Sequence, residues 1–188
     1  MVRLNLPIHI STNRLSVQAL KYEDAEEMFY TYASKPEATR FVSWPTHQSI
    51  EDTRSFLRHA VTTWNAGTEY SYSVRIKQNA RLIGSFGVVN DNGKLQFGYI
   101  FSPTQWGNGY ATEVAKTMMD LIAHEQGVYR IQTFVDSENI ASIRVLEKCG
   151  LVEEARLPAW FRFINQGDVP KDCILFRLPI RQVRDPVA

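Results

Sequence analysis

Ten residues between two regular segments restrict the fold of this chain more than any other stretch. The run Ser102–Ala111 carries Gly107 and Gly109 and follows an alternating apolar segment at 95–101 that is typical of a strand. A segment of helical period begins at Tyr110. Free N–H groups and the dipole at a helix start attract anions, and glycine lets a phosphate approach the backbone closely. The turn therefore predicts a cradle for the pyrophosphate of a nucleotide-like cofactor, with a plain glycine-bearing loop as the alternative.

The apolar pattern along the chain predicts strands and helices packed on one sheet. Asp91-Asn92-Gly93 is a strong hairpin turn, and Ser49 with Asp52 resembles a capping box at a helix start. Lys35-Pro36 is expected to end the first helix. The predicted strands are 14–20, 69–77, 81–89, 95–101, 130–136, 151–164 and 173–180, and the predicted helices are 24–34, 49–66, 110–126 and 139–148.

Composition restricts the class of protein. With 188 residues, 44% of them hydrophobic, we expect one domain over 1–188 with a sizeable core. The net charge of +1 provides no bulk field for nucleic acid or an anionic membrane. Apolar runs too short for a bilayer and the lack of a signal-peptide pattern favour a cytoplasmic location. Cys149 and Cys173 lack CxxC spacing and the histidines lack ligand spacing, so we expect reduced thiols and no metal site.

Two long motifs carry a resemblance to a known family. The segment WGNGYATE at 106–113 resembles the cofactor loop of the RimJ/RimL-type branch of the GNAT superfamily of acetyl-CoA-dependent N-acetyltransferases. The segment ENIASIRVLEKCGL at 138–151 is similar to that branch's Glu-Asn-x-x-Ser-x-x-Val-Leu-Glu-Lys-x-Gly-Phe signature. Rival phosphate loops fit less well, because no Gly-Lys-Ser/Thr is present and Thr112 stands where a dinucleotide fingerprint needs Gly or Ala.

The resemblance covers nearly the whole chain, with the core of the domain at about 12–180, and it implies a fold and a cofactor site. The fold is α/β (α+β), a mixed and mostly antiparallel central sheet of about seven strands flanked by about four helices, with the fourth and fifth strands splayed apart. Acetyl-CoA is the implied cosubstrate. The pantetheine arm is expected to pair with the exposed strand edge, and a backbone amide near Tyr99–Phe101 is expected to polarise the thioester carbonyl. Ile100 and Phe101 are therefore the contact candidates, through their backbone. Asn139 is expected to cap a helix, bind pantetheine, or do both. The pyrophosphate is expected at the backbone amides of Trp106, Gly107, Asn108, Gly109, Tyr110 and Ala111.

The catalytic groups are only partly implied. Ser142 is the leading candidate to stabilise or protonate the departing thiolate, with a surface serine of no special role as the alternative. Gln96 stands where the family often has a glutamate base, so the base stays open. The remaining candidates, each with a solvated side chain as the alternative, are Glu69, Glu153, Glu154, Asp172 and His47.

The resemblance points to acetylation of a primary amine by direct attack on the thioester. A protein N-terminal α-amine, of the ribosomal-protein type, is the expected acceptor. The alternatives are a small amine such as a polyamine or antibiotic, and a non-catalytic CoA-binding regulatory module. We expect the acceptor pocket at Phe41–Thr46, the start of the second helix and 160–168. Five aromatic side chains are candidates to line this pocket, with a place in the hydrophobic core as the alternative for each: Trp44, Tyr70, Tyr72, Trp160 and Phe161. A homodimer is common in this branch and is a possible assembly.

Overall fold

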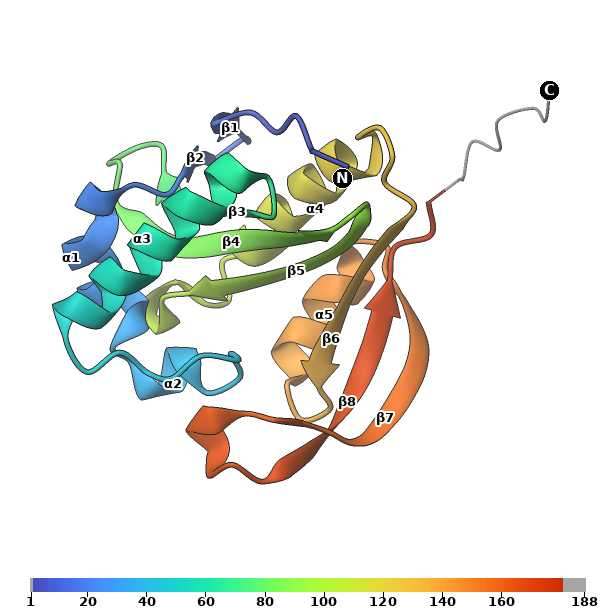
Figure 1. Ribbon diagram of the computed structural model, residues 1–188. Helices are drawn as coiled ribbons and strands as arrows, with labels where there is room; N and C mark the ends of the chain where they lie inside the picture. Colours follow the sequence, from blue (N-terminus) through green and yellow to red (C-terminus); the bar gives the residue numbers. More distant parts are fainter. Residues whose placement is uncertain (1, 181–188) are drawn as a thin grey trace.

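A computed structural model describes residues 2–180, which form an eight-stranded sheet in the order β1-β2-β3-β4-β5-β6-β8-β7 (Figure 1). Every neighbouring pair is antiparallel except β5 and β6. The mixed, mostly antiparallel sheet predicted from the sequence is therefore confirmed. The strands are β1 (His9–Ser11), β2 (Leu15–Ala19), β3 (Glu69–Ile76), β4 (Leu82–Asp91), β5 (Lys94–Phe101), β6 (Arg130–Asp136), β7 (Val152–Arg162) and β8 (Pro170–Arg177).

Helices cover both faces of this sheet. One hydrophobic cluster joins Met28 and Leu57 to Ile100 of β5, and a larger cluster joins Val114 and Leu146 to β5 and β6. In Figure 1, α3 accordingly lies in front of the strands and α4 behind them. The helices are α1 (Ala25–Met28), α2 (Pro36–Thr39), α3 (Ile50–Ala66), α4 (Tyr110–Ala123) and α5 (Ile140–Lys148).

The start of α3 shows how local sequence sets an element. Ser49 Oγ accepts from the N–H of Asp52 at 3.3 Å, and Asp52 Oδ2 accepts from the N–H of Ser49 at 2.9 Å. Two N–H groups that the helix leaves free are thus satisfied, as the capping-box pattern predicted. The helix ends at Ala66, and Gly67 follows with a φ of 77°, the left-handed conformation that glycine adopts without strain.

The first predicted helix is the main departure from the expected elements. Residues 24–34 are not one α-helix, because 22–24 form a 3-10 turn, 25–28 are α1 and 29–33 form a π turn. The irregular turn buries Tyr32 and brings its hydroxyl to Ser85 on β4. Pro36 ends this segment but also begins α2, since its fixed φ suits the first position of a helix.

Other predicted boundaries are wrong by a few residues. The helix predicted to end at 126 ends at Ala123, and the strand predicted to reach Ile180 ends at Arg177. The three-residue strand β1 was missed, so the described sheet has eight strands instead of seven. Of the span predicted as one domain, residues 1 and 181–188 lie outside the described residues.

The parallel pair β5–β6 is short and opens at one end. Its ladder has three pairs, from Lys94–Arg130 to Gln96–Gln132. Thr133 Oγ1 then donates to the Phe97 carbonyl at 2.8 Å, and the paired register goes no further. The two strands separate toward their carboxyl ends (Figure 1). The predicted splay of these strands is therefore confirmed.

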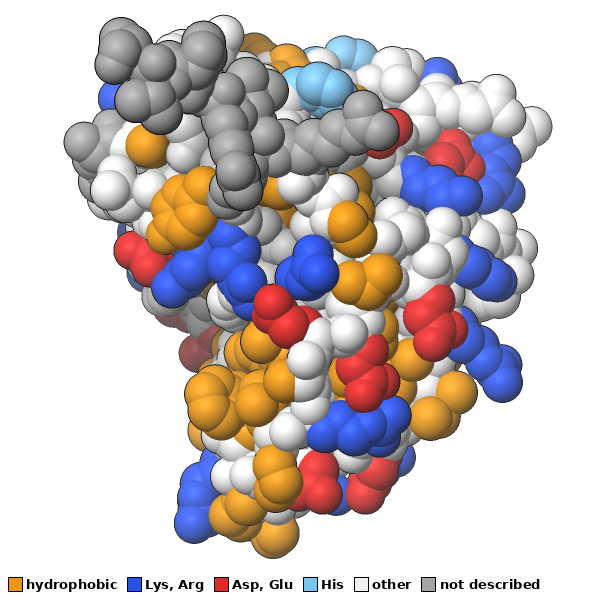
Figure 2. Space-filling model, turned by 90° about the vertical axis from the view of Figure 1, so that its right-hand side faces the viewer, with side chains coloured by type: hydrophobic (Ala, Val, Ile, Leu, Met, Phe, Trp, Pro, Cys, Tyr) orange, Lys and Arg blue, Asp and Glu red, His pale blue; other side chains and the backbone are white. Residues whose placement is uncertain are grey.

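The far edge of the sheet is formed by β7. Its charged side chains pair with neighbours, as in Glu153–Arg156 at 2.8 Å and the contact of Glu154 with Arg130. Figure 2 shows acidic and basic side chains interspersed on this side of the molecule. Charged side chains along an edge strand disfavour pairing with a foreign strand.

Candidate active site

The loop before α4 presents a run of backbone N–H groups with no protein acceptor. Within the described residues, none of the N–H groups from Gly107 through Thr112 donates a hydrogen bond to another protein group. Gly107 and Gly109 have φ of 80° and 77°, so the loop turns through conformations that glycine tolerates best. A Cβ on Gly107 would meet no atom within 4 Å. The loop is thus an open cradle of donors at the positive end of a helix, which suits a phosphate group.

An ion pair made by Arg14, the residue before β2, supports this loop. Arg14 Nε donates to Glu113 Oε2 at 2.7 Å, and Arg14 Nη1 donates to the Asn108 carbonyl at 3.0 Å. The guanidinium also lies over the ring of Tyr110, 4.5 Å from its centre. Burial raises the pKa of Glu113, but hydrogen bonds from Thr12 and Arg14 outweigh it and hold that pKa below its ordinary value. An ionised carboxylate therefore fixes the first turn of α4 to the sheet.

Two predicted contacts in the loop are already partly engaged. The N–H of Trp106 donates to the Pro103 carbonyl at 3.2 Å, so the free run begins one residue later than expected. The Trp106 ring is 55% exposed, and its Nε1 donates to the Phe101 carbonyl at 3.0 Å. The Asn108 side chain closes the turn by donating to the Gln105 carbonyl at 3.1 Å. Trp106 therefore shapes the loop more than it offers a donor.

Beyond the ladder, β5 has free backbone groups on the side of β6. The N–H of Ser102 donates to the Ile83 carbonyl of β4 at 2.8 Å. Because antiparallel bonds recur at every second residue, the N–H of Ile100 also points to β4, whereas those of Tyr99 and Phe101 point toward β6. The amide of Ile100 is thus committed to the ladder. Phe101 and Tyr99, the two ends of the stretch expected to supply the oxyanion donor, can donate into the opening.

The start of α5 lies at the end of β6. Asn139 caps this helix, since its Oδ1 accepts from the N–H of Ser142 at 3.2 Å. The capping role predicted for Asn139 is confirmed, and a contact with pantetheine stays a prediction. Ser142 is half-buried on the first turn of α5.

The carboxylates considered as bases are engaged elsewhere. Gln96 sits in the last pair of the β5–β6 ladder, where its amide cannot take up a proton. Glu153 and Glu154 lie in ion pairs on β7, away from the opening of the ladder. Glu69 is 3.3 Å from His59, and Asp172 accepts from the N–H of Ala159 at 2.8 Å. No carboxylate of this set is therefore a free base at the splay.

His47 is buried, whereas the sequence favoured an exposed loop histidine. Its Nδ1 is 2.8 Å from Thr53 Oγ1, and its ring centre is 4.9 Å from that of Trp44. Burial lowers the pKa of His47, against the opposing effect of Asp52, and so favours the neutral ring. Of the predicted aromatic wall, Tyr70 and Tyr72 belong to the core.

Asn165, at the tip between β7 and β8, joins two segments that are far apart in sequence. Its Nδ2 donates to the carbonyls of Thr39 at 2.7 Å and Trp44 at 2.9 Å. Its Oδ1 accepts from the N–H of Thr46 at 2.9 Å and from Thr46 Oγ1 at 3.2 Å. We call this set of contacts the Asn165 clamp. It holds the segment 39–46 against the hairpin, as a wall for the predicted acceptor side, and the sequence showed only a turn residue here.

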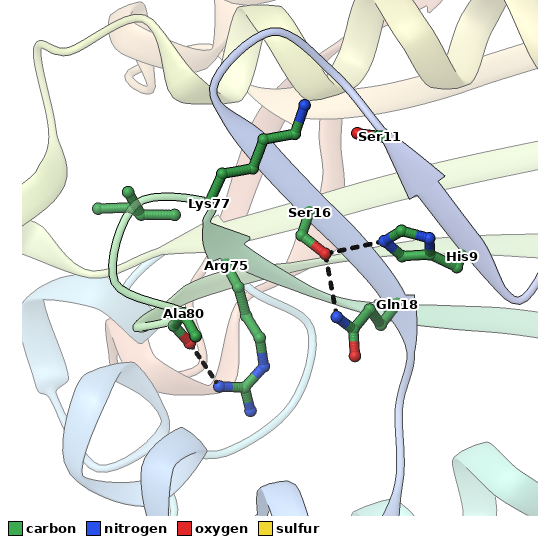
Figure 3. A pocket seen from close by; sticks show the side chains of 8 residues that line it. His9, Ser11, Ser16, Gln18, Arg75, Lys77 and Ala80 are labelled. Carbon is green, nitrogen blue, oxygen red and sulfur yellow. Dashed lines mark hydrogen bonds between the residues drawn. The ribbon is translucent and has the colours of Figure 1, made fainter.

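A cavity of about 300 Å³ lies elsewhere, among β1, β2, β3 and the turn after β3 (Figure 3). Figure 3 shows Ser16 bonded to His9 and Gln18, and Arg75 bonded to the Ala80 carbonyl. Arg75 also pairs with Asp24 at 2.7 Å. This cavity contains none of the predicted site residues, and its arginine is already neutralised.

Residues 2–180 contain neither a cluster of metal ligands nor a membrane-spanning helix. No three His, Cys, Asp or Glu side chains in this range are grouped to hold a metal ion. No helix in the same range has the length and apolar character needed to cross a membrane. The thiols of Cys149 and Cys173 are free.

Comparison with known proteins assigns the family. Residues 14–152 match the family model described as an acetyltransferase (GNAT) domain. The uncharacterized N-acetyltransferase p20 of Bacillus licheniformis is 26% identical over 149 residues, which is 78% of this chain and 83% of that protein. The ribosomal-protein-S5-alanine acetyltransferase of Vibrio fischeri has a TM-score of 0.82 at 18% identity, covering 96% of this chain and 100% of that one. The spermidine N-acetyltransferase of Vibrio cholerae, solved with CoA and spermine, has a TM-score of 0.74 at 19% identity, covering 88% and 95%.

Proposed function

Because this chain belongs to the GNAT family of acetyltransferases, we propose that it transfers the acetyl group of acetyl-CoA to a protein N-terminal α-amine. The observation that carries the proposal is the run of free N–H groups at 107–112, together with the free amides where the β5–β6 ladder opens. The first can bind a pyrophosphate and the second a thioester carbonyl, which are the two recognisable parts of acetyl-CoA. The related spermidine enzyme was itself solved with CoA.

The residues divide into three roles. Amides of Gly107, Asn108, Gly109, Tyr110 and Ala111 hold the pyrophosphate, and Arg14 with Glu113 fixes their loop. The N–H of Phe101 or Tyr99 donates to the thioester oxygen as negative charge develops there. Asn139 contacts the pantetheine arm, and Ser142 donates a hydrogen bond to the sulfur as it leaves.

The reaction follows from these roles. The amine nitrogen attacks the thioester carbonyl carbon, a tetrahedral intermediate forms, and the C–S bond breaks. The amine loses one proton and CoA departs as a thiol that has gained one. Because a serine hydroxyl is a weak acid, Ser142 acts by stabilising the thiolate with a hydrogen bond, more than by full proton transfer.

The acceptor follows from the missing base. At pH 7.5 an α-amine with a pKa near 7.8 is about one-third neutral, whereas a lysine amine with a pKa near 10.4 is about 0.1% neutral. Gln96 cannot deprotonate either one, and the candidate carboxylates Glu69, Glu153, Glu154 and Asp172 are engaged elsewhere. Because none of these candidates is free to act as the base, an α-amine is the better matched acceptor. The proposal includes one catalytic domain at about 12–180 and a cytoplasmic location, which suits two free thiols.

The test is release of free thiol from acetyl-CoA in the presence of different amines. The panel contains a peptide with a free N-terminus, the same peptide with a blocked N-terminus and one lysine, spermidine, and an aminoglycoside. We expect release with the free N-terminus, and Ser142→Ala should lower kcat about 10- to 100-fold with little change in KM. Release only with spermidine or the aminoglycoside would show that the acceptor is a small amine and not a protein N-terminus. Binding of acetyl-CoA without release of thiol would indicate a non-catalytic module.

A further inference from the structure

Among residues 2–180, the hydroxyl of Tyr99 is the one buried side-chain polar atom without a hydrogen-bond partner. Buried hydroxyls are normally paired, because an unpaired one costs free energy. The other buried tyrosines follow this rule. Tyr70 bonds to Leu4 at 3.1 Å, and Tyr72 donates to the Pro7 carbonyl at 3.0 Å. The exception at Tyr99 therefore needs an explanation beyond packing.

The ring of Tyr99 is held in place on both sides. It stacks on Phe86 of β4 with ring centres 6.4 Å apart, and it meets Phe101 at 6.3 Å. Side chains alternate along β5, so Tyr99 lies with Phe97 and Phe101 in the cluster that packs against α4 and α5. The hydroxyl is thus directed into the protein by a fixed ring.

The Tyr99 hydroxyl lies near two residues of α5 and its end, Ser142 on the first turn and Cys149 after the last. Burial raises the pKa of Tyr99 to about 12, the nearby Ser142 hydroxyl lowers it, and the nearby Cys149 raises it. Ser142 is therefore close, although the two hydroxyls do not meet the geometry of a hydrogen bond. A tyrosine with this pKa keeps its proton at pH 7 and is available as a donor.

We propose that Tyr99 is a positioning residue, whose hydroxyl donates a hydrogen bond to Ser142 Oγ as the CoA thiolate forms. Ser142 has one hydrogen and two lone pairs, so accepting from Tyr99 leaves its own hydrogen for the sulfur. A hydroxyl that accepts one hydrogen bond donates another more strongly. The unpaired hydroxyl of Tyr99 is thus available to donate when negative charge develops on the departing sulfur. This inference rests on the proposed acetyl transfer and on the role of Ser142 in it.

The test compares Tyr99→Phe with Tyr70→Phe, a matched control at a buried tyrosine outside the site. Tyr99→Phe should lower kcat about 3- to 10-fold with KM for acetyl-CoA unchanged, and it should leave Tm unchanged or raise it by a few degrees, because it removes an unpaired group. Tyr70→Phe should lower Tm and keep kcat. In the double variant Tyr99→Phe/Ser142→Ala, kcat should equal that of Ser142→Ala alone.

Three results would overturn the proposal. The first is a normal kcat for Tyr99→Phe. The second is a double variant whose losses multiply, because Tyr99 would then act without Ser142. The third is a fall in Tm that accompanies the fall in kcat, which would assign Tyr99 to the fold. A wild-type protein that releases no thiol with any amine would instead refute the proposed function, and this role with it.

Discussion

Replacing Asn165 would remove four hydrogen bonds at once. In the Asn165 clamp, the side-chain amide of Asn165 donates to the carbonyls of Thr39 and Trp44 and accepts two hydrogen bonds from Thr46. Each such bond contributes about 1 kcal/mol net, and Asn165 is half-buried, so water restores part of the loss. We expect Asn165→Ala to lower the free energy of unfolding by about 2 to 3 kcal/mol. For a chain of this length that corresponds to a fall in Tm of about 4 to 12 °C.

Asn165→Asp provides the sharper comparison. The substitution keeps both contacts in which residue 165 accepts from Thr46. It replaces the amide nitrogen by a carboxylate oxygen, which would repel the carbonyls of Thr39 and Trp44 to which the amide donates. We expect it to be at least as destabilising as Asn165→Ala at pH 7. Because the ionised form is the disfavoured one, the pKa of the new carboxyl should be raised, and the deficit should shrink as the pH falls through it.

Urea unfolding followed by tryptophan fluorescence measures these differences, and Val169→Ala, an exposed change in the same hairpin, is the control. In the transfer assay, the variants should raise KM for the amine and leave KM for acetyl-CoA unchanged. Asn165→Asp with wild-type stability at pH 7 would refute the assigned contacts. An equal rise in KM for both substrates would refute the placement of the clamp on the acceptor side.

Two more predictions concern the cofactor loop. Gly107 and Gly150 have φ of 80° and 81°, and a Cβ on either would meet no atom within 4 Å. Gly107→Ala and Gly150→Ala should therefore each lower the free energy of unfolding by about 1 kcal/mol, through backbone strain alone. Only Gly107→Ala should raise KM for acetyl-CoA. Equal KM values would exclude Gly107 from the cofactor site. The lowered pKa of Glu113 means that its stabilisation is present above the unfolded pKa, near 4.3, and is lost as the pH falls through the folded value. Urea midpoints of wild type and Glu113→Gln should therefore converge as the pH falls through that lowered folded value, and a constant gap would contradict the ion pair with Arg14.

The features that could be predicted from the sequence are those made by residues close together along the chain. The loop at 106–111, the capping box at Ser49 and the cap at Asn139 each lie within a few residues of their partners, so the sequence revealed them. The splay of β5 and β6 came from the family resemblance and not from the residues themselves.

The missed features depend on contacts between distant residues. Asn165 lies 119 positions from Thr46, and the burial of His47 depends on α3 and Trp44. No periodic pattern marks the three residues of β1 or the π turn at 29–33, because each is decided by the elements packed around it. The orphan hydroxyl of Tyr99 is likewise visible only when every buried polar atom has been placed.

The short β5–β6 ladder also divides the chain into two blocks. All strands on one side of it come from 9–101 and all strands on the other from 130–177. Each block pairs with itself through neighbouring antiparallel strands, and three parallel pairs join the blocks. The blocks can therefore acquire their hydrogen bonds independently, with the seam between them closing last. In native-state hydrogen exchange, amides of the β5–β6 pairs should exchange sooner than those inside β3–β4 or β6–β8, which would make the seam where the cosubstrate would bind a weak join inside the sheet.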